Sequence, residues 1–438
     1  MMHSKELQTF VDQILARQTL PLPGVVVSVA RGERLESAFH DRNLSAGREN
    51  VEERTRFRYG SFTKVLVAAL VCQLVDKGLL ALDDEVSRHL PEFTLADVTV
   101  RHLLSHTGGL IDLWHYAKTP DEVIAQVVKV GLCSEPGRLF SYSNPGYVVL
   151  GRLVERISGL DWVELLRREW LQPLGIDSIT NGVETAAFEA QEYYFCQETR
   201  ELREGALWPD TGMGFDAAGG RLQGTAQDAA LIAAAIMTGT VPGNGTRLLS
   251  PSMVEQMLTP QAKVPGAGLI GSHWCLGWSL LTGERTSAPV YGHFGGTSVI
   301  VAACPRQDMT CAVLTNSPFG TRMGQSLVKH YFGKDPGTPE REPQSVPPHD
   351  LTRLVGRYKS ETMEVEIRQE NGLLLMTNPM DGQFIPLQHL YDLNFCMDFD
   401  AMVVDVVFMT ASDEERPSLI HFALRALYRV PDQAQAPA

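Results

Sequence analysis

Two hydrophobic patterns divide the chain. Up to about residue 334, apolar residues recur with helical spacing or form short continuous runs, which predicts helices and buried strands. Between residues 363 and 368, apolar Met, Val and Ile alternate with Glu, Glu and Arg, and similar alternation returns after residue 400. A period of two is typical of strands with one buried face. The pattern therefore predicts a mixed α/β region followed by a smaller antiparallel β region.

The first region begins with an amphipathic helix and continues with strands and helices. Residues 21–30 predict an early strand, residues 61–180 are mostly helical, and strands are expected around 298–315. The segment 325–332 predicts a closing helix. The apolar positions of the first helix follow helical spacing: Leu7, Phe10, Val11, Ile14 and Leu15.

A linker separates the two regions. Residues 335–350 are rich in proline and charge, a composition that resists both helix and sheet. Beyond it, Asn371-Gly372 and Asp381-Gly382 are hairpin turn signals. We therefore predict a small antiparallel β domain over residues 351–438, with a packing role or a role in covering a site.

Composition narrows the classes of protein. The 438 residues are enough for two domains, the hydrophobic fraction of 44% is ordinary, and the net charge is −14. A net negative charge argues against nucleic acid and against an anionic membrane surface as partners. No apolar run reaches the roughly 18 residues of a membrane span.

The N-terminus and the cysteines predict a cytoplasmic location. Residues 1–7 lack the apolar core of a signal peptide and contain an early Glu6. The 7 cysteines are scattered, with no Cys-x-x-Cys pair, which suits free thiols in a reducing compartment.

Ser61-Phe62-Thr63-Lys64 is the first candidate for chemistry. It opens an apolar run that predicts a helix ending at Lys77-Gly78. Residues three apart share a helix face, so the Ser61 hydroxyl and the Lys64 amine would lie one turn apart. A partly desolvated amine can take the proton of a serine nucleophile. Taken alone, a serine here is more often a helix cap.

A second candidate lies near Tyr142 and Asn144. The Asn-Pro-Gly sequence that follows predicts a short loop carrying both side chains. A lysine ammonium nearby would lower the pKa of the Tyr142 phenol from about 10, so tyrosinate or lysine could act as general base. Asn144 could hold the lysine or a substrate carbonyl. The alternative is that Tyr142 packs and Asn144 caps a turn.

The third candidate is the segment from Tyr291 to Thr297, which precedes a predicted buried strand. Gly295 and Gly296 would let a substrate backbone approach closely, and the Gly296 N–H with that of Ser61 could form an oxyanion hole. His293 could orient substrate. The alternative is a glycine-rich turn with an incidental histidine.

In this order and spacing, the three motifs resemble those of the serine β-lactamase and penicillin-binding-protein superfamily, in its class C-like branch. They match its Ser-x-x-Lys, Tyr-x-Asn and (Lys/His)-x-Gly positions, and the segments 101–110 and 219–228 are similar too. The resemblance implies a serine catalytic domain over residues 1–334 with an antiparallel transpeptidase-like sheet, flanking helices and a helical subdomain. It also implies that residues 351–438 form a lipocalin-like β-barrel.

The resemblance implies a catalytic mechanism, and one departure from the family pattern narrows the substrates. Ser61 would form an acyl-enzyme, with Lys64 and Tyr142 moving protons, and no cofactor or metal is implied. His293 replaces the lysine of classical β-lactamases, which disfavours β-lactam hydrolysis. His102 and His106 are four residues apart, but no Glu or third ligand accompanies them as in a zinc site.

Three readings remain open. The first is a penicillin-binding-protein-type thioesterase that releases and macrocyclises a nonribosomal peptide, acting on a small-molecule or peptidyl substrate that a carrier protein could hold. Arg425 or Arg429, in the last predicted strand, would then bind a terminal carboxylate. The second is a D-stereospecific peptidase or esterase. The third is a non-catalytic β-lactam-type binder or sensor.

Overall fold

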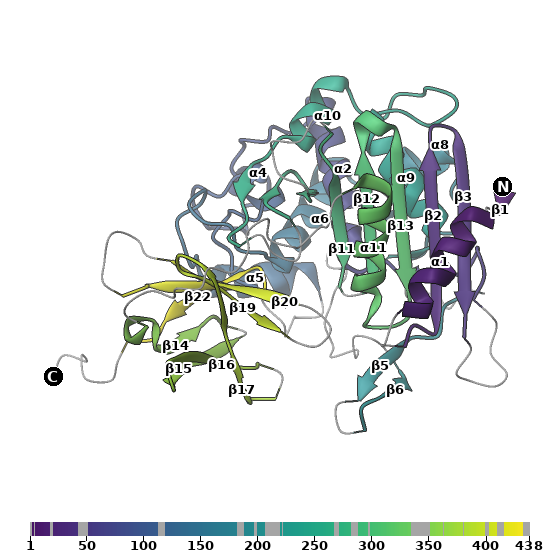
Figure 1. Ribbon diagram of the computed structural model, residues 1–438. Coiled ribbons are helices and arrows are strands. Elements are labelled where there is room, and N and C mark those ends of the chain that lie inside the picture. The colour runs from purple at the N-terminus through teal and green to yellow at the C-terminus, as the bar shows by residue number, and fades with distance from the viewer. Residues whose placement is uncertain are drawn as a thin grey trace.

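The computed structural model has two parts that lie side by side, a sheet covered by helices and a smaller β-barrel (Figure 1). A mixed α/β (α+β) fold with a C-terminal antiparallel β-barrel is therefore confirmed. The structure describes the following residues: 2–3, 5–17, 21–42, 51–112, 119–181, 188–196, 199–205, 220, 222–266, 271–281, 288–296, 298–333, 351–361, 363–379, 381–398, 403–409 and 416–431.

Over the described residues, the main sheet has nine strands, and every pair is antiparallel except β1 with β3. Early and late segments of the chain meet inside the sheet, where β2 pairs with β13. In spatial order the strands are β1 (Met2–His3), β3 (Arg34–Asp41), β2 (Gly24–Arg31), β13 (Met309–Thr315), β12 (Val299–Cys304), β11 (Tyr291–Gly295), β10 (Ser279–Leu280), β9 (His273–Trp274) and β8 (Ala262–Lys263).

Helices cover both faces of this sheet, which explains why its central strands are continuously apolar. In β2, Val25 and Val27 face one core while Val26 and Ala30 face the other. The first core lies under α1 (Lys5–Arg17) and α11 (Gly320–Phe332), and the second lies under α2 (Thr63–Asp76) and α9 (Ala226–Thr238) (Figure 1).

The helical subdomain packs around α2, which is buried along almost its whole length. A 3₁₀ turn, Gly60–Phe62, leads directly into this helix, and Gly78 follows its C-cap with a φ of 70°. The other α-helices described are α3 (Val86–His89), α4 (Val100–Leu104), α5 (Pro120–Val130), α6 (Asn144–Ser158), α7 (Trp162–Leu166), α8 (Gln172–Leu174) and α10 (Pro251–Leu258).

In the part of the C-terminal domain that the structure describes, nine antiparallel strands form a nearly closed barrel around their own apolar core. The predicted Asn371-Gly372 turn joins its second and third strands in sequence, with both residues at positive φ. In spatial order the strands are β17 (Phe384–Pro386), β16 (Leu373–Thr377), β15 (Glu364–Glu370), β14 (Gly356–Lys359), β22 (Arg425–Arg429), β21 (Leu419–Phe422), β20 (Val403–Met409), β19 (Asn394–Asp398) and β18 (Gln388–Tyr391).

Four short strands form two small ribbons beside the main sheet. The strand β4 (Phe57–Arg58) pairs with β7 (Gln223–Gly224), and β5 (Tyr193–Cys196) pairs with β6 (Glu201–Glu204). The first ribbon lies immediately before the 3₁₀ turn at Ser61, so it helps to fix the entry of the chain into α2.

The sequence placed most elements correctly and misjudged some ends. The closing helix α11 begins at Gly320 rather than at the predicted residue 325. The prediction began too late because Gly324, in the second turn of the helix, weakens the helical signal in the sequence. That glycine is needed, since an added Cβ would lie 2.1 Å from Ile300. The predicted linker over residues 335–350 lies outside the described residues. Among the helices described, none is both long and apolar enough to cross a bilayer.

Candidate active site

Ser61 lies in the 3₁₀ turn at the start of α2, where it packs against the end of β11. Gly60 has a φ of 53°, and an added Cβ would lie 3.0 Å from the backbone of Gly295. At Gly295 an added Cβ would lie 2.0 Å from the carbonyl oxygen of Tyr59. Glycine at both positions therefore lets the two backbones meet. This contact brings Gly295 and Gly296 beside Ser61, as an oxyanion hole requires.

Lys64 is fully buried and bonds to the candidate nucleophile. Its Nζ lies 3.1 Å from Ser61 Oγ and 2.7 Å from Asn144 Oδ1. Burial lowers the pKa of Lys64 to about 7, although the carboxylate of Asp112 acts in the opposite direction. Near neutral pH, a large fraction of the amine is thus unprotonated and able to accept the proton of Ser61.

Tyr142 also hydrogen-bonds to Ser61, but its phenol is not acidic. We expected the lysine to lower the pKa of Tyr142, and this expectation is wrong. The side chain is buried, and burial raises the pKa because it penalises the phenolate. The Lys64 ammonium lies over the ring, with Nζ 5.2 Å from its centroid. Tyr142 is therefore suited to pass a proton as a neutral phenol, and Lys64 is the better base.

Asn144 is the first residue of α6 rather than part of a loop. Ser143 caps this helix by accepting the Gly146 N–H, which explains why the Asn-Pro-Gly sequence starts a helix here. The Asn144 side chain donates from Nδ2 to Asp112 Oδ1 at 3.1 Å while its Oδ1 accepts from Lys64. Asn144 thus holds the lysine, one of the two roles predicted for it.

Sequence reasoning missed Asp112. Its side chain is only 1% exposed, and it joins Asn144 to Arg425 of the C-terminal domain. The available signal was an acidic residue directly after the apolar pair Leu110-Ile111, where a carboxylate is rare unless it has partners. The partner, Arg425, is 313 residues away, so no local pattern could identify it.

The two candidate arginines of β22 have different places. Arg425 reaches the site, where its Nε donates to Asp112 at 2.7 Å. Arg429 does not reach it. The Arg429 guanidinium bonds within the C-terminal domain, to the carbonyls of Pro417, Val355 and Arg353 and to the Tyr358 hydroxyl. The prediction that Arg429 binds substrate is therefore wrong, because its donors already stabilise the barrel.

His293 projects from the middle of β11 into a buried position. Its Nδ1 lies 2.9 Å from the carbonyl oxygen of Phe294, so Nδ1 carries the hydrogen. Burial, and next the charge of Lys64, lower the pKa of His293 to about 3, so the ring is neutral. Its Nε2 is then a buried acceptor without a hydrogen-bond partner among the described residues.

The other two candidate histidines have structural roles. His102 completes a capping box with Thr99 at the start of α4. His106 accepts the Ser143 N–H at Nδ1, 3.1 Å away, and its ring lies 4.2 Å from that of Tyr142. No group of three metal-ligating side chains occurs among the residues that the structure describes.

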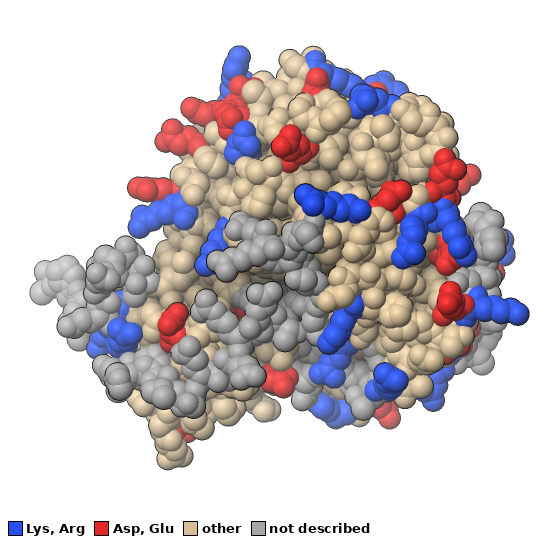
Figure 2. Space-filling model, turned by 45° about the horizontal axis from the view of Figure 1, so that its top comes forward, with Lys and Arg blue, Asp and Glu red and all other residues tan. Residues whose placement is uncertain are grey.

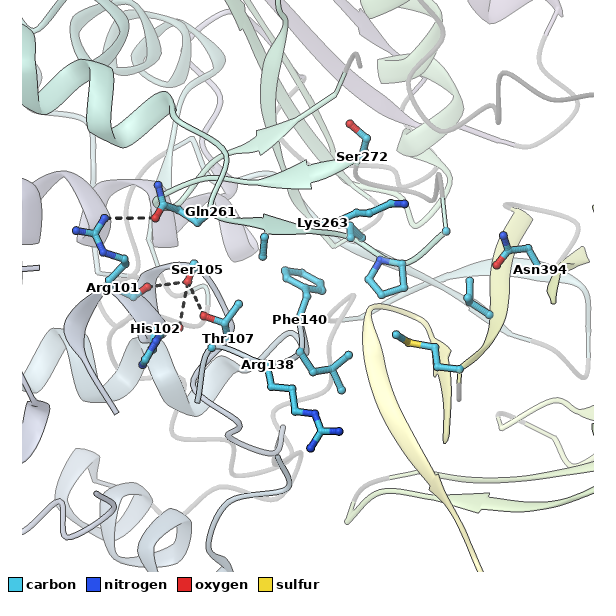
Figure 3. A pocket seen from close by; sticks show the side chains of 18 of the residues that line it. Arg101, His102, Ser105, Thr107, Arg138, Phe140, Gln261, Lys263, Ser272 and Asn394 are labelled. Carbon is cyan, nitrogen blue, oxygen red and sulfur yellow. Dashed lines mark hydrogen bonds between the residues drawn. The ribbon is translucent and has the colours of Figure 1, made fainter. Parts of the chain in front are cut away.

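A separate cavity of about 880 Å³ lies between the two domains (Figure 3). It is bounded by α4, the edge strand β8 and strands β19 and β20 of the barrel, and Phe140 projects into it. Arg101 contributes to its wall but is hydrogen-bonded to Gln261. Ser61, Lys64 and Tyr142 do not line this cavity, so it is distinct from the candidate active site.

The surface carries mixed charge. On the face shown in Figure 2, Lys and Arg side chains are interspersed with Asp and Glu among the residues described. This face therefore has no broad area of one sign in its described part.

Comparisons with known proteins identify the family. A sequence model described as Beta-lactamase matches residues 7–330. Penicillin-binding protein 4 of Amycolatopsis lactamdurans is 31% identical over 333 residues, covering 70% of this chain and 84% of the relative. Esterase EstB of Burkholderia gladioli is 37% identical over 201 residues, 39% of this chain and 49% of the esterase.

Among solved structures, SurE with D-Leu is 26% identical with a TM-score of 0.77, and the match covers 97% of this chain and 99% of SurE. The likeness thus extends over both domains. The family match over most of the sequence and the named relatives show that this chain belongs to the Beta-lactamase family and is an enzyme of the serine hydrolase and acyltransferase kind.

Proposed function

We propose that this enzyme is a penicillin-binding-protein-type thioesterase, which takes a peptide from a carrier-bound thioester and closes it into a ring. The observation that carries the proposal is the buried Nε2 of His293 near Lys64, which has no hydrogen-bond partner among the described residues. A lone pair in this place suits a substrate group with an N–H, such as an attacking amine. It does not suit the carboxylate that a lysine would bind in a classical β-lactamase.

The first chemical step acylates Ser61. The Ser61 Oγ attacks the thioester carbonyl while Lys64 accepts the hydroxyl proton, with Tyr142 bonded to the same oxygen. The N–H groups of Ser61 and Gly296 hold the oxyanion. The carbon–sulfur bond then breaks, and the leaving thiolate takes the proton from Lys64. An acyl-serine ester and a free thiol result.

The second step releases the product and regenerates the free Ser61 hydroxyl. The amine at the other end of the peptide attacks the acyl-serine carbonyl, with one N–H donated to His293 Nε2. The carbon–oxygen bond breaks, Ser61 recovers a proton through Lys64 or Tyr142, and a lactam leaves. If water attacks instead, the product is the linear acid. The same residues serve both outcomes, so the second nucleophile decides between cyclisation and hydrolysis.

Two further observations support a peptide substrate. SurE, whose likeness covers both domains, was solved with D-Leu, which favours a D-residue in the substrate. Arg425 brings a guanidinium from the C-terminal domain to the site, where a terminal carboxylate could share it with Asp112. Both suit a substrate whose two ends meet at one serine.

A D-stereospecific peptidase or esterase is the second candidate. The likeness to esterase EstB favours it, since simple esters would use the same serine and lysine. A binder or sensor that acylates without turnover is the third. The proton path through Lys64 and Tyr142 favours turnover over a stable acyl-enzyme.

Mass spectrometry of the products tests the proposal. The substrate is a peptidyl thioester with a D-residue at the reacting carbonyl and a free N-terminal amine. The controls are its N-acetylated analogue, which cannot cyclise, and the Ser61→Ala variant. A Ser61-dependent product lighter than the acid by one water supports the cyclase. Linear acid alone, from both substrates, would reject it in favour of a hydrolase, and a lasting acyl-enzyme would favour the binder.

A further inference from the structure

The barrel domain is joined to the catalytic serine by a continuous chain of polar contacts. Arg425 donates to Asp112, Asp112 accepts from Asn144, Asn144 accepts from Lys64, and Lys64 bonds to Ser61. The side chains of Asp112 and Arg425 are 1% and 14% exposed. In this series of contacts, the buried pair of Asp112 and Arg425 joins the two domains.

Asp112 decides which way the Asn144 amide points. Its Oδ1 accepts both the backbone N–H and the Nδ2 of Asn144, at 2.9 and 3.1 Å. With Nδ2 facing a carboxylate, the amide oxygen must face Lys64, where it accepts from Nζ at 2.7 Å. An amide turned by 180° would present its NH₂ to the lysine and lose both contacts. The direction of this amide fixes the lysine against Ser61.

Arg425 holds Asp112 from the other side. The two groups form an ion pair with Nη2 2.5 Å and Nε 2.7 Å from Oδ2, a two-point contact that fixes the carboxylate in place. Arg425 Nη1 is bonded to the carbonyl of Ala423, so the guanidinium is itself held.

The turn that carries Arg425 is shaped for this contact. Ala423 and Leu424 form the two-residue turn between β21 and β22, with φ values of 48° and 71°. Such turns favour Gly or Asn, because other residues are strained at positive φ. The Tyr142 N–H donates to the Leu424 carbonyl at 2.8 Å, and the Ala426 N–H donates to Ser141 Oγ at 3.3 Å. Ser141 and Tyr142 of the catalytic domain thus hydrogen-bond to the strained turn on both of its sides.

We propose that Asp112 is a positioning residue of the active site, and that the barrel domain takes part in acylation by holding Asp112 through Arg425. Arg425 on this view acts on the lysine through Asp112 and Asn144 and need not touch the substrate. The proposal deepens the assignment of Ser61 as acyl-enzyme nucleophile and rests on it.

The charges of Asp112 and Arg425 shift the pKa of Lys64 in opposite directions, so the pH dependence of acylation distinguishes their effects. The carboxylate of Asp112 raises the pKa of Lys64 and the guanidinium of Arg425 lowers it, against the larger lowering by burial. Burial keeps the other titratable side chains that face Lys64 neutral at pH 7: His106, His293, Tyr142 and Tyr147.

The test uses a small neutral ester, such as an activated acetate, with no carboxylate for Arg425 to bind. Single-turnover acylation of Ser61 is followed by intact mass from pH 5 to 9 in the full-length enzyme. Asp112→Asn and Arg425→Gln should each slow acylation about 10- to 100-fold at the pH plateau. The pKa of the acid limb should fall in Asp112→Asn and rise in Arg425→Gln.

Arg429→Gln is the matched control, since Arg429 lies on the same strand but bonds within the barrel. It should leave acylation unchanged. Equal slowing by Arg429→Gln and Arg425→Gln would mean barrel damage and overturn the proposal. Wild-type rates in the Asp112 and Arg425 variants, or pH shifts in one shared direction, would overturn it as well. The experiment measures acylation and not cyclisation, so it tests the role of Asp112 even if the enzyme only hydrolyses its substrates. A wild-type enzyme that is never acylated would instead refute the assignment of Ser61 as the nucleophile.

Discussion

The Nζ of Lys64 lies 3.1 Å from the Oγ of Ser61, on the first turns of the same helical segment. Because burial lowers the pKa of this amine to about 7, Lys64 is charged in acid and mostly neutral above pH 7. Only the neutral amine can accept the proton of Ser61, so the pH dependence of acylation reports on this pair.

We expect kcat/KM for a neutral ester to rise with pH and to level off above about pH 7, the pKa of Lys64. The rate rises with pH because protonated Lys64 has no lone pair with which to accept the proton of Ser61. Lys64→Ala should lower the rate about 10⁴-fold or more and remove the limb. A rate that falls as pH rises through 7 would contradict this role.

Tyr142→Phe separates the phenol from the lysine. Because burial raises the pKa of Tyr142, it is neutral throughout this range. The variant should lose about 10²- to 10⁴-fold in rate but keep the acid limb of the profile. Loss of the limb in Tyr142→Phe would instead identify tyrosinate as the base.

Gly60→Ala tests the meeting of the two backbones. The added Cβ would lie 3.0 Å from Gly295, and φ is 53°, so we expect a loss of about 1–3 kcal/mol in unfolding free energy together with slower acylation. Gly78→Ala is the control, because φ is 70° but nothing lies within 4 Å. It should cost only about 1 kcal/mol and leave kinetics intact. Equal kinetic effects in both would exclude a specific role for the Gly60 contact.

A pair of substitutions at His293 tests the role of its Nε2, which has no hydrogen-bond partner among the described residues. Asn at this position can keep the donor toward the Phe294 carbonyl but lacks an atom at Nε2, whereas Gln can place an acceptor near Nε2. We expect His293→Asn to lower the ratio of cyclic to linear product more than His293→Gln does. The ratio is measured by chromatography on the free-amine thioester, and the reverse order would argue against an acceptor role.

Arg429→Ala addresses the barrel alone. It removes a guanidinium that donates to three carbonyls and to Tyr358, so the free energy of unfolding should fall by about 2–4 kcal/mol. The measurement is denaturant unfolding followed by circular dichroism. Unchanged stability would show that these hydrogen bonds add little.

Sequence alone was sufficient for what is local. The Ser61 and Lys64 pair follows from a helical spacing of three, and the strands and hairpins follow from apolar periodicity and turn residues, as at Asn371-Gly372. The hydrophobic periods predicted a mixed α/β region followed by an antiparallel β region, and the resemblance to the superfamily supplied the arrangement of the sheet and the barrel.

Only the tertiary structure decided what depends on distant parts of the chain. Asp112 and Arg425 meet across 313 residues, and Arg429, four residues later, bonds inside the barrel instead. The phenol of Tyr142 was expected to be acidic, but its pKa depends on burial and on charges brought from other elements. Spacing along the chain determines which side chains share a face of a helix or strand. Desolvation and ion pairing depend on which faces pack together, and that is determined only in the folded protein.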